Sequence, residues 1–202
     1  IPLFADSDAN FPNHHPDPAV EENLAQLKMK VKETGADCGI AFDGDGDRIG
    51  VVDENGSYIA ADEYMIIIWR DIYDKVRKKE GFFDVKCSKK LEDELVKLGI
   101  KPICVRTGNS YTKKISFEND YPFGGELSGH VYFRDRFIGI DDGIYAGLRL
   151  IEILSRKKTR ASKLLDDVTS YLSTPEEKIE VDEEKKDYIV SRVEEYCIAK
   201  KY

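Results

Sequence analysis

The chain has 202 residues and a formal net charge of −8, from 39 Asp and Glu against 31 Lys and Arg. An acidic chain without a dense run of Lys and Arg repels a phosphodiester backbone, so we expect no nucleic-acid partner. The longest uninterrupted apolar stretch, residues 64–69, has only six residues. Because a membrane-spanning helix needs about 20, we expect no membrane partner either.

Hydrophobic residues make up 41% of the chain and charged residues 35%, which is typical of a folded chain with one or two domains. The four cysteines stand at least 17 positions apart. That spacing matches no zinc or redox motif, so we expect buried, reduced thiols in a cytoplasmic protein. The chain opens without Met or a signal peptide, and we expect it to be a piece of a longer protein.

The first third of the chain predicts a helix followed by a hairpin. Apolar residues spaced three and four apart indicate a helix from Ala19 to Gly35. Short apolar runs at 38–42 and 49–52 predict two strands on either side of the polar turn 43–48. A second turn of the hairpin type follows at 54–56.

Strand and helix patterns then alternate. Asp62 is expected to cap a helix that reaches about residue 79. Alternation with connections long enough for a helix favours an α/β fold, with a mixed, mostly parallel sheet layered between helices. The later elements expected are strand 82–85, helix 89–98, strand 103–105, helix 111–117, strand 131–133, helix 141–155, helix 162–171, strand 179–181 and a helix from residue 183 onward.

The turn 43–48, with the sequence DGDGDR, carries Asp43, Asp45 and Asp47 at alternate positions separated by glycines. Three close carboxylates repel one another unless a cation compensates them, and the glycines let the backbone curl around one point. Oxygen ligands suit a hard cation, and the open positions that remain favour Mg²⁺ over Ca²⁺. We therefore predict a magnesium site, with a solvated acidic loop as the alternative.

An EF-hand loop is a competing interpretation, because Glu54 stands at its twelfth position when Asp43 is its first. Arg48 occupies the position that requires Gly, and the flanking segments are predicted strands, so we disfavour it. Arg48 next to a metal would instead offer a forked donor to a phosphate.

A second polar loop, residues 125–130, reads GELSGH. It places Glu126, Ser128 and His130 at alternate positions, so the three side chains can point the same way. A carboxylate can accept hydrogen bonds from two neighbouring hydroxyls, and a serine can donate or accept beside it. A sugar-binding loop and an ordinary capped turn are equally compatible with this segment alone.

With both loops in view, the chain resembles the α-D-phosphohexomutase superfamily, specifically its phosphomannomutase/phosphoglucomutase branch. DGDGDR at 43–48 resembles the magnesium loop of that family and GELSGH at 125–130 its sugar-binding loop. The segment 10–18 is similar to one typical of the same branch. The branch usually has Met where this chain has Leu127, and phosphoglucosamine mutases typically have a polar residue there.

The resemblance implies roles for individual residues. Asp43, Asp45 and Asp47 would hold Mg²⁺, and Glu126 and Ser128 would bind O3 and O4 of the sugar. The catalytic candidates are Arg48, Lys86 and His130, and the further substrate-binding candidates are Arg106 and Asn109. The family often has His in place of Asn109 and Lys in place of Arg106, so a proton-transfer role at Asn109 is not implied.

The reaction implied is interconversion of hexose 6-phosphate and hexose 1-phosphate, with hexose 1,6-bisphosphate as intermediate and activator and an enzyme phosphoserine as carrier. The phosphoserine segment typical of the family is not found in these residues, so we expect no turnover by the chain alone. We expect residues 1–57 to be the second part of domain 2, 58–170 domain 3, and 171–202 a linker and the start of domain 4. The alternatives are a phosphoglucosamine mutase and a non-enzymatic metal- or sugar-binding module.

Overall fold

The structure is a computed structural model that describes residues 1–6, 8–172, 174 and 179–201. It contains two compact units, Ile1–Tyr171 and Leu172–Tyr202. Among the described residues, no helix combines the length and the apolar content needed to cross a bilayer.

The first unit begins with a small antiparallel sheet of strands β1 (Cys38–Phe42), β2 (Ile49–Asp53) and β3 (Tyr58–Ile59). Helix α1 (Ala25–Thr34) covers one face, where a Cβ on Gly39 would meet the side chains of Leu27 and Val31. The next residue along β1 points to the other face, where Ile40 meets helix α5 (Gly143–Lys157). The predicted hairpin is confirmed, and its turn 43–48 lies at the end of β1.

The first helix is shorter than predicted. Residues Glu21–Leu24 form a 3-10 turn (η1), and α1 proper begins at Ala25. It ends as predicted, because Gly35 adopts φ 66°, a left-handed conformation that stops a helix and favours glycine.

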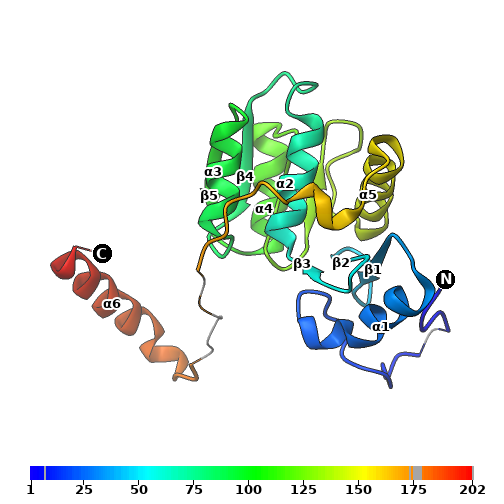
Figure 1. Ribbon diagram of the computed structural model, residues 1–202. Coiled ribbons are helices and arrows are strands. Elements are labelled where there is room, and N and C mark those ends of the chain that lie inside the picture. The colour runs from blue at the N-terminus through cyan, green and yellow to red at the C-terminus, as the bar shows by residue number, and fades with distance from the viewer. Residues whose placement is uncertain (7, 173, 175–178, 202) are drawn as a thin grey trace. The chain divides into compact units, whose positions relative to one another are not determined.

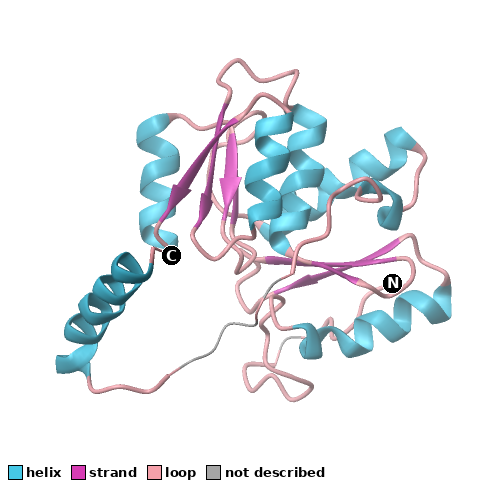
Figure 2. Cartoon of the chain, turned by 60° about the vertical axis from the view of Figure 1, so that its left-hand side comes forward, coloured by secondary structure: helices cyan, strands magenta, loops and turns pink. Residues whose placement is uncertain are grey.

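The second sheet carries the α/β character of the fold. Its strands are β4 (Glu80–Asp84), β5 (Lys101–Val105), β6 (Phe123–Gly125) and β7 (Val131–Phe133), in the order β5-β4-β6-β7. Strand β4 runs parallel to β5 and β6, and only β7 is antiparallel. Helix α2 (Ala61–Ile72) leads from β3 into β4, α3 (Lys89–Lys97) connects β4 to β5, and α4 (Asn109–Asn119) connects β5 to β6. Helices lie on both faces of this sheet (Figures 1 and 2), so the predicted fold class is confirmed.

Helix α2 differs from the prediction at both ends. It stops at Ile72 and not near residue 79; residues 73–75, which follow, are exposed, so the buried face of the helix does not continue. Asp62 does not cap it; the N-cap is Ala60, whose N–H donates to the Glu63 carboxylate at 3.2 Å. The Asp62 carboxylate accepts the Glu63 N–H at 2.9 Å and, through its other oxygen, the N–H of Ser88 at 3.1 Å, just before α3.

Two predicted elements are wrong: the helix over 162–171 and the strand over 179–181. Residues 162–171 form only a 3-10 turn, η2 (Ala161–Leu164), because Arg70 binds the Leu164 carbonyl at 3.0 Å and the Asp167 carboxylate, taking the acceptor that a longer helix would use. Residues 179–181 form no strand, since no described strand pairs with them. The last helix is confirmed, as the 3-10 turn η3 (Glu183–Lys185) followed by α6 (Lys186–Lys200).

The predicted burial of all four thiols is wrong for Cys104, which is exposed on the edge strand β5. The other three are half-buried. Alternate residues of an edge strand can face solvent because helices cover the sheet incompletely at its border.

Helix α2 forms the centre of the core. Ten of its twelve residues are buried, including the polar Asp62 and Asp71, which bind neighbouring elements. The core that surrounds α2 also includes Ile49 and Val51 of the first sheet and Phe83 and Phe123 of the second. The two sheets therefore share one hydrophobic core, which fixes the loops at their edges relative to each other.

Gly81 in β4 provides a test of this packing. A Cβ at this position would lie 2.3 Å from Cζ2 of Trp69, in the middle of the shared core. We expect Gly81→Ala to lower the free energy of unfolding by about 1–3 kcal/mol, because neither the strand nor the buried indole can move freely. Urea denaturation measures this change. The double variant with Trp69→Phe should recover part of the loss, and an unchanged stability of Gly81→Ala would contradict the packing.

Candidate active site

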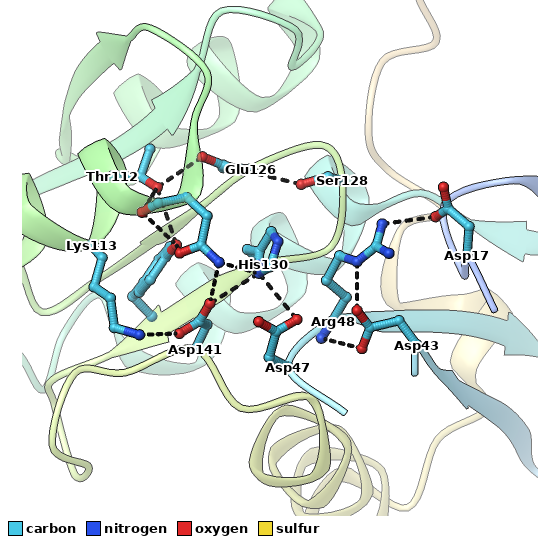
Figure 3. A network of polar contacts seen from close by, with 12 residues as sticks. Asp17, Asp43, Asp47, Arg48, Thr112, Lys113, Glu126, Ser128, His130 and Asp141 are labelled. Carbon is cyan, nitrogen blue, oxygen red and sulfur yellow. Dashed lines mark hydrogen bonds and ion pairs between the residues drawn. The ribbon is translucent and has the colours of Figure 1, made fainter. Parts of the chain in front are cut away.

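The two motif loops lie against each other in the first unit (Figure 3). The Ile49 N–H donates to the Gly129 carbonyl at 3.2 Å, and Arg48 and His130 form an isolated antiparallel bridge. The Gly143 N–H at the start of α5 donates to the Gly46 carbonyl at 2.9 Å. A Cβ on Gly129 would lie 2.6 Å from the Ile49 carbonyl oxygen, so this approach requires glycine.

Arg48 holds the acidic turn in shape. Its backbone N–H donates to Asp43 Oδ1 at 3.1 Å, and its Nε donates to Asp43 Oδ2 at 2.8 Å. Its Nη1 donates to Asp17 Oδ1 at 3.0 Å. Burial of Asp43 opposes ionisation, but the hydrogen bonds from Arg48 outweigh it and lower the pKa of this carboxyl. The guanidinium is therefore fixed at the site by two carboxylates.

Asp43, Asp45 and Asp47 converge as predicted, with one carboxylate oxygen from each lying within 4.8 Å of the others. Asp47 Oδ1 is buried and has no hydrogen-bond donor among the described residues. Burial, together with the charges of Asp43, Asp141 and Asp45, raises the pKa of Asp47 to about 6, although His130 opposes this. A buried acceptor without a donor and mutual repulsion among carboxylates are the features that a bound cation would relieve, so these residues fit a hard divalent metal.

The EF-hand interpretation is wrong. Strands and not helices flank the turn, and Glu54 lies in the turn between β2 and β3. Its carboxylate accepts the N–H of Ser162 at 3.1 Å and the Ser162 hydroxyl at 2.5 Å. Glu54 is thus committed to a contact that anchors η2.

Glu126 is the buried centre of the second loop, with 2% of its surface exposed. Its Oε1 accepts the Gly108 N–H at 3.0 Å and the Thr112 hydroxyl at 2.8 Å. Its Oε2 accepts the Ser128 hydroxyl at 3.1 Å. Three donors hold the carboxylate in one orientation, and Ser128 and Glu126 lie side by side as the sequence predicted (Figure 3).

His130 is held between two carboxylates. Its Nδ1 lies 3.0 Å from Asp141 Oδ2 and 3.5 Å from Asp47 Oδ1. Burial opposes the charged imidazole, but the hydrogen bond to Asp141 and the charge of Asp47 outweigh it and raise the pKa of His130. Since Nδ1 faces Asp141, the ring is oriented to exchange a proton at Nε2.

Asp141 accepts from three side chains. Besides His130, it accepts Asn109 Nδ2 at 2.9 Å and Lys113 Nζ at 3.0 Å, both from α4. Burial opposes its ionisation, but the hydrogen bonds from His130 and Lys113 hold the pKa of Asp141 below its usual range. Asp47, His130 and Asp141 also lie close enough to hold a metal, but the cations already bound to Asp141 favour an ion-pair network there.

Two further predicted site residues lie near the carboxyl edge of the sheet. Lys86 is exposed in the turn that follows β4, at the carboxyl edge of the sheet where ligands of α/β proteins bind. Arg106 is exposed after β5, and its guanidinium lies over the ring of Tyr111, 4.2 Å from the centroid.

Comparison with known proteins matches two consecutive parts of the chain to one family. Residues 1–56 match the family description "Phosphoglucomutase/phosphomannomutase, alpha/beta/alpha domain II", and residues 60–171 match that of domain III of the same family. The chain belongs to the phosphoglucomutase/phosphomannomutase family.

Individual members of the family match most of the chain. A phosphomannomutase/phosphoglucomutase of Pseudomonas putida is 43% identical over 194 residues, which are 96% of this chain and 42% of the relative. A phosphoglucomutase of Neisseria gonorrhoeae is 41% identical over 181 residues, covering 90% of this chain and 39% of the relative. The crystal structure of a family protein from Burkholderia thailandensis superposes with a TM-score of 0.80 at 44% identity, over 86% of this chain and 38% of that one. The chain thus spans about two fifths of the length of these relatives.

Several residues of the candidate site in this member of the phosphoglucomutase/phosphomannomutase family were not predicted from the sequence. Asp17 lies just before the helix predicted from Ala19, and Thr112 and Lys113 lie inside the helix predicted over 111–117, where nothing in the pattern marks them as site residues. Asp141 and Asp142 open the helix predicted over 141–155, a position typical of capping residues, yet only Asp142 caps α5, by accepting the Tyr145 N–H at 2.8 Å. Because a helix needs only one capping side chain, the presence of a second acidic residue, Asp141, was the signal that could have indicated a role in the site.

Proposed function

We propose that these residues belong to a phosphomannomutase/phosphoglucomutase, which interconverts hexose 6-phosphate and hexose 1-phosphate through a bisphosphorylated sugar and an enzyme phosphoserine. One observation carries the proposal. In a chain 43% identical to a relative of that name, Glu126, Ser128 and His130 are packed against the turn that bears three converging carboxylates. The phosphoserine would lie in a domain that these residues do not include. Residues 1–57, 58–170 and 171–202 would be parts of domains 2, 3 and 4.

Each side chain has a proposed part in the reaction. Glu126 and Ser128 would bind two neighbouring hydroxyls of the hexose, O3 and O4. They would make no contact at C2, the one carbon at which glucose and mannose differ, so both sugars could bind. His130 would transfer the proton of the reacting hydroxyl through Nε2, with Asp141 orienting the ring. Arg48 would place its remaining guanidinium nitrogen, Nη2, which is not bound to Asp43 or Asp17, toward the phosphoryl group.

The remaining roles concern charge. Asp43, Asp45 and Asp47 would hold Mg²⁺, which when bound supplies positive charge to the transferring phosphoryl group. Lys86 and Arg106 would add positive charge at the carboxyl edge of the sheet, where the phosphate of the substrate must approach. Asn109 would contribute a hydrogen bond only, since its side chain is held by Asp141.

Turnover by the whole protein tests the proposal. We expect mannose 1-phosphate and glucose 1-phosphate to be converted at comparable rates, and glucosamine 1-phosphate much more slowly. The 202-residue chain alone should bind sugar phosphate without converting it. Conversion of glucosamine 1-phosphate alone would replace the proposal by a phosphoglucosamine mutase, and no conversion of any of the three would favour a binding module.

Asp45→Asn tests the metal assignment, because its effects on the free and the metal-bound chain should have opposite signs. Without Mg²⁺, losing one of three repelling carboxylates should leave the melting temperature unchanged or slightly higher. With Mg²⁺, the wild-type chain should gain stability in proportion to RT ln(1+[Mg²⁺]/Kd), whereas the variant should need roughly tenfold more Mg²⁺ for the same gain. Thermal unfolding across a Mg²⁺ series measures both effects.

Asp37→Asn is the matched control, since Asp37 is an exposed acidic residue before β1, at the opposite end of that strand from the turn. It should keep the full response to Mg²⁺. If the melting temperature of the wild-type chain did not change with Mg²⁺, the turn would be a solvated acidic loop and not a metal site.

A further inference from the structure

A cleft of about 540 Å³ lies at the opposite end of the second sheet from the candidate active site. Its walls include residues 75–78, which precede β4, Pro122, which precedes β6, and residues 134–136, which follow the antiparallel strand β7. These positions mark the amino edge of the parallel strands. The candidate active site lies at the carboxyl edge, where β4 ends at Asp84 and β6 at Gly125.

The cleft is basic in a chain that is acidic overall. Seven of its lining residues are Lys or Arg and three are Asp, whereas the whole chain has a charge of −8. The basic residues come from separate elements: the α2–β4 loop gives Lys75, Arg77 and Lys78, the end of β7 gives Arg134 and Arg136, and α5 gives Arg149 and Arg156.

Acidic residues neutralise only part of the positive charge of the cleft. Asp120 binds Arg134 at 3.0 Å and Asp135 binds Arg149 at 2.8 Å. The Asp71 carboxylate is shared by Lys75 and Arg156, so one acid serves two cations.

Two bordering residues, Glu80 and Glu152, bind Lys78 and Arg136. Within the described part of the chain, Arg77 makes no hydrogen bond or ion pair and is exposed. Five acids therefore face seven cations, which leaves two positive charges.

We propose that this cleft binds a phosphate-bearing small molecule at a site separate from the sugar site. Two uncompensated positive charges match a phosphate monoester, which carries about −1.5 to −2 at pH 7. Guanidinium forks fit phosphate oxygens in pairs, and five of the seven cations are arginines. The volume lies within the range of small-molecule sites, about 300–1,000 Å³, and the charged walls select an ionic ligand over an apolar one.

The test is an NMR titration of the isotope-labelled 202-residue chain with inorganic pyrophosphate and with glucose 6-phosphate, at constant ionic strength. We expect saturable shifts of the amides of residues 73–78 and 134–136 with both probes, in addition to any shifts at the sugar site. Arg77→Glu should weaken binding at the cleft roughly tenfold, because it replaces an uncompensated cation by an anion. Arg77 is exposed without partners, so the variant should fold normally.

Lys114→Glu is the matched control, an equal reversal of charge at an exposed position of α4 outside the cleft. It should change the cleft affinity by less than about twofold. Shifts confined to the sugar site, shifts that rise linearly without saturation, or equal weakening by both variants would each overturn the proposal. So would shifts at the cleft of this chain that are absent from the whole protein, because another segment would then occupy the cleft.

Discussion

Replacing Glu126 with Gln should abolish most of the affinity of this chain for a sugar phosphate. The buried carboxylate accepts from Gly108, Thr112 and Ser128, and an amide would turn an NH₂ group toward one of those donors. Left unpaired, buried donors cost about 1–3 kcal/mol, so the free energy of unfolding should fall by that amount. The charge that would accept two sugar hydroxyls is lost as well, and we expect affinity to fall roughly 100-fold.

Isothermal titration with glucose 1-phosphate and urea denaturation measure the two effects. Glu118→Gln is the matched control, because Glu118 is an exposed residue of α4 whose ion pair with Lys114 spans 3.7 Å; neither readout should change. Ser128→Ala should weaken binding less than Glu126→Gln, since it removes one of several donors. Unaltered affinity in Glu126→Gln would show that the loop does not hold the sugar.

Exchange of Asp141 for Asn should slow turnover by the whole protein roughly 100-fold to 10,000-fold, the range expected when a general acid or base loses its effectiveness. The carboxylate orients His130 through Nδ1 at 3.0 Å and favours its charged form. In the variant the pKa of His130 should fall, which an NMR titration of the imidazole in the 202-residue chain detects without any catalytic assay. A structural role alone would not move this pKa in concert with kcat.

The neighbouring residue provides a matched control. Asp142→Asn makes the same chemical change one position later, where the side chain caps α5. Because Asn caps a helix about as well as Asp, stability, kcat and the pKa of His130 should all stay near their wild-type values. If Asp141→Asn left the titration of His130 unchanged, the assignment of Asp141 as its positioning residue would be wrong.

Local sequence patterns predicted most of the second sheet and its helices. Strand β7, the start of α3 and the end of α1 at Gly35 follow from apolar runs, a polar start and a left-handed glycine. The errors occurred where a distant side chain decided the outcome. Arg70 binds the Leu164 carbonyl from another part of the chain, and the Asp62 carboxylate, besides the Glu63 N–H, accepts the N–H of Ser88, 26 positions away.

In the candidate site, too, local motifs were predictable and contacts between residues distant in sequence were not. Asp43, Asp45 and Asp47 were predictable because alternation with glycine in a short turn brings them together whatever the rest of the chain does. Glu126, Ser128 and His130 were predictable in the same way. No local pattern indicates that Asn109 reaches Asp141 across 32 positions, or that Arg48 reaches Asp17 across 31.

The sequence alone determined the chemistry available to this member of the phosphoglucomutase/phosphomannomutase family: three carboxylates suited to a hard cation, and a Glu-Ser-His loop suited to a sugar. Only the tertiary structure decided how these groups are held. The shared core around α2 brings the two sheets together, so that the backbone of Gly143 bonds that of Gly46 and the backbone of Gly129 bonds that of Ile49. Burial at that junction raises the pKa of Asp47 and leaves its Oδ1 without a donor. Such effects depend on desolvation and on neighbours distant in sequence, which no local pattern of residues contains.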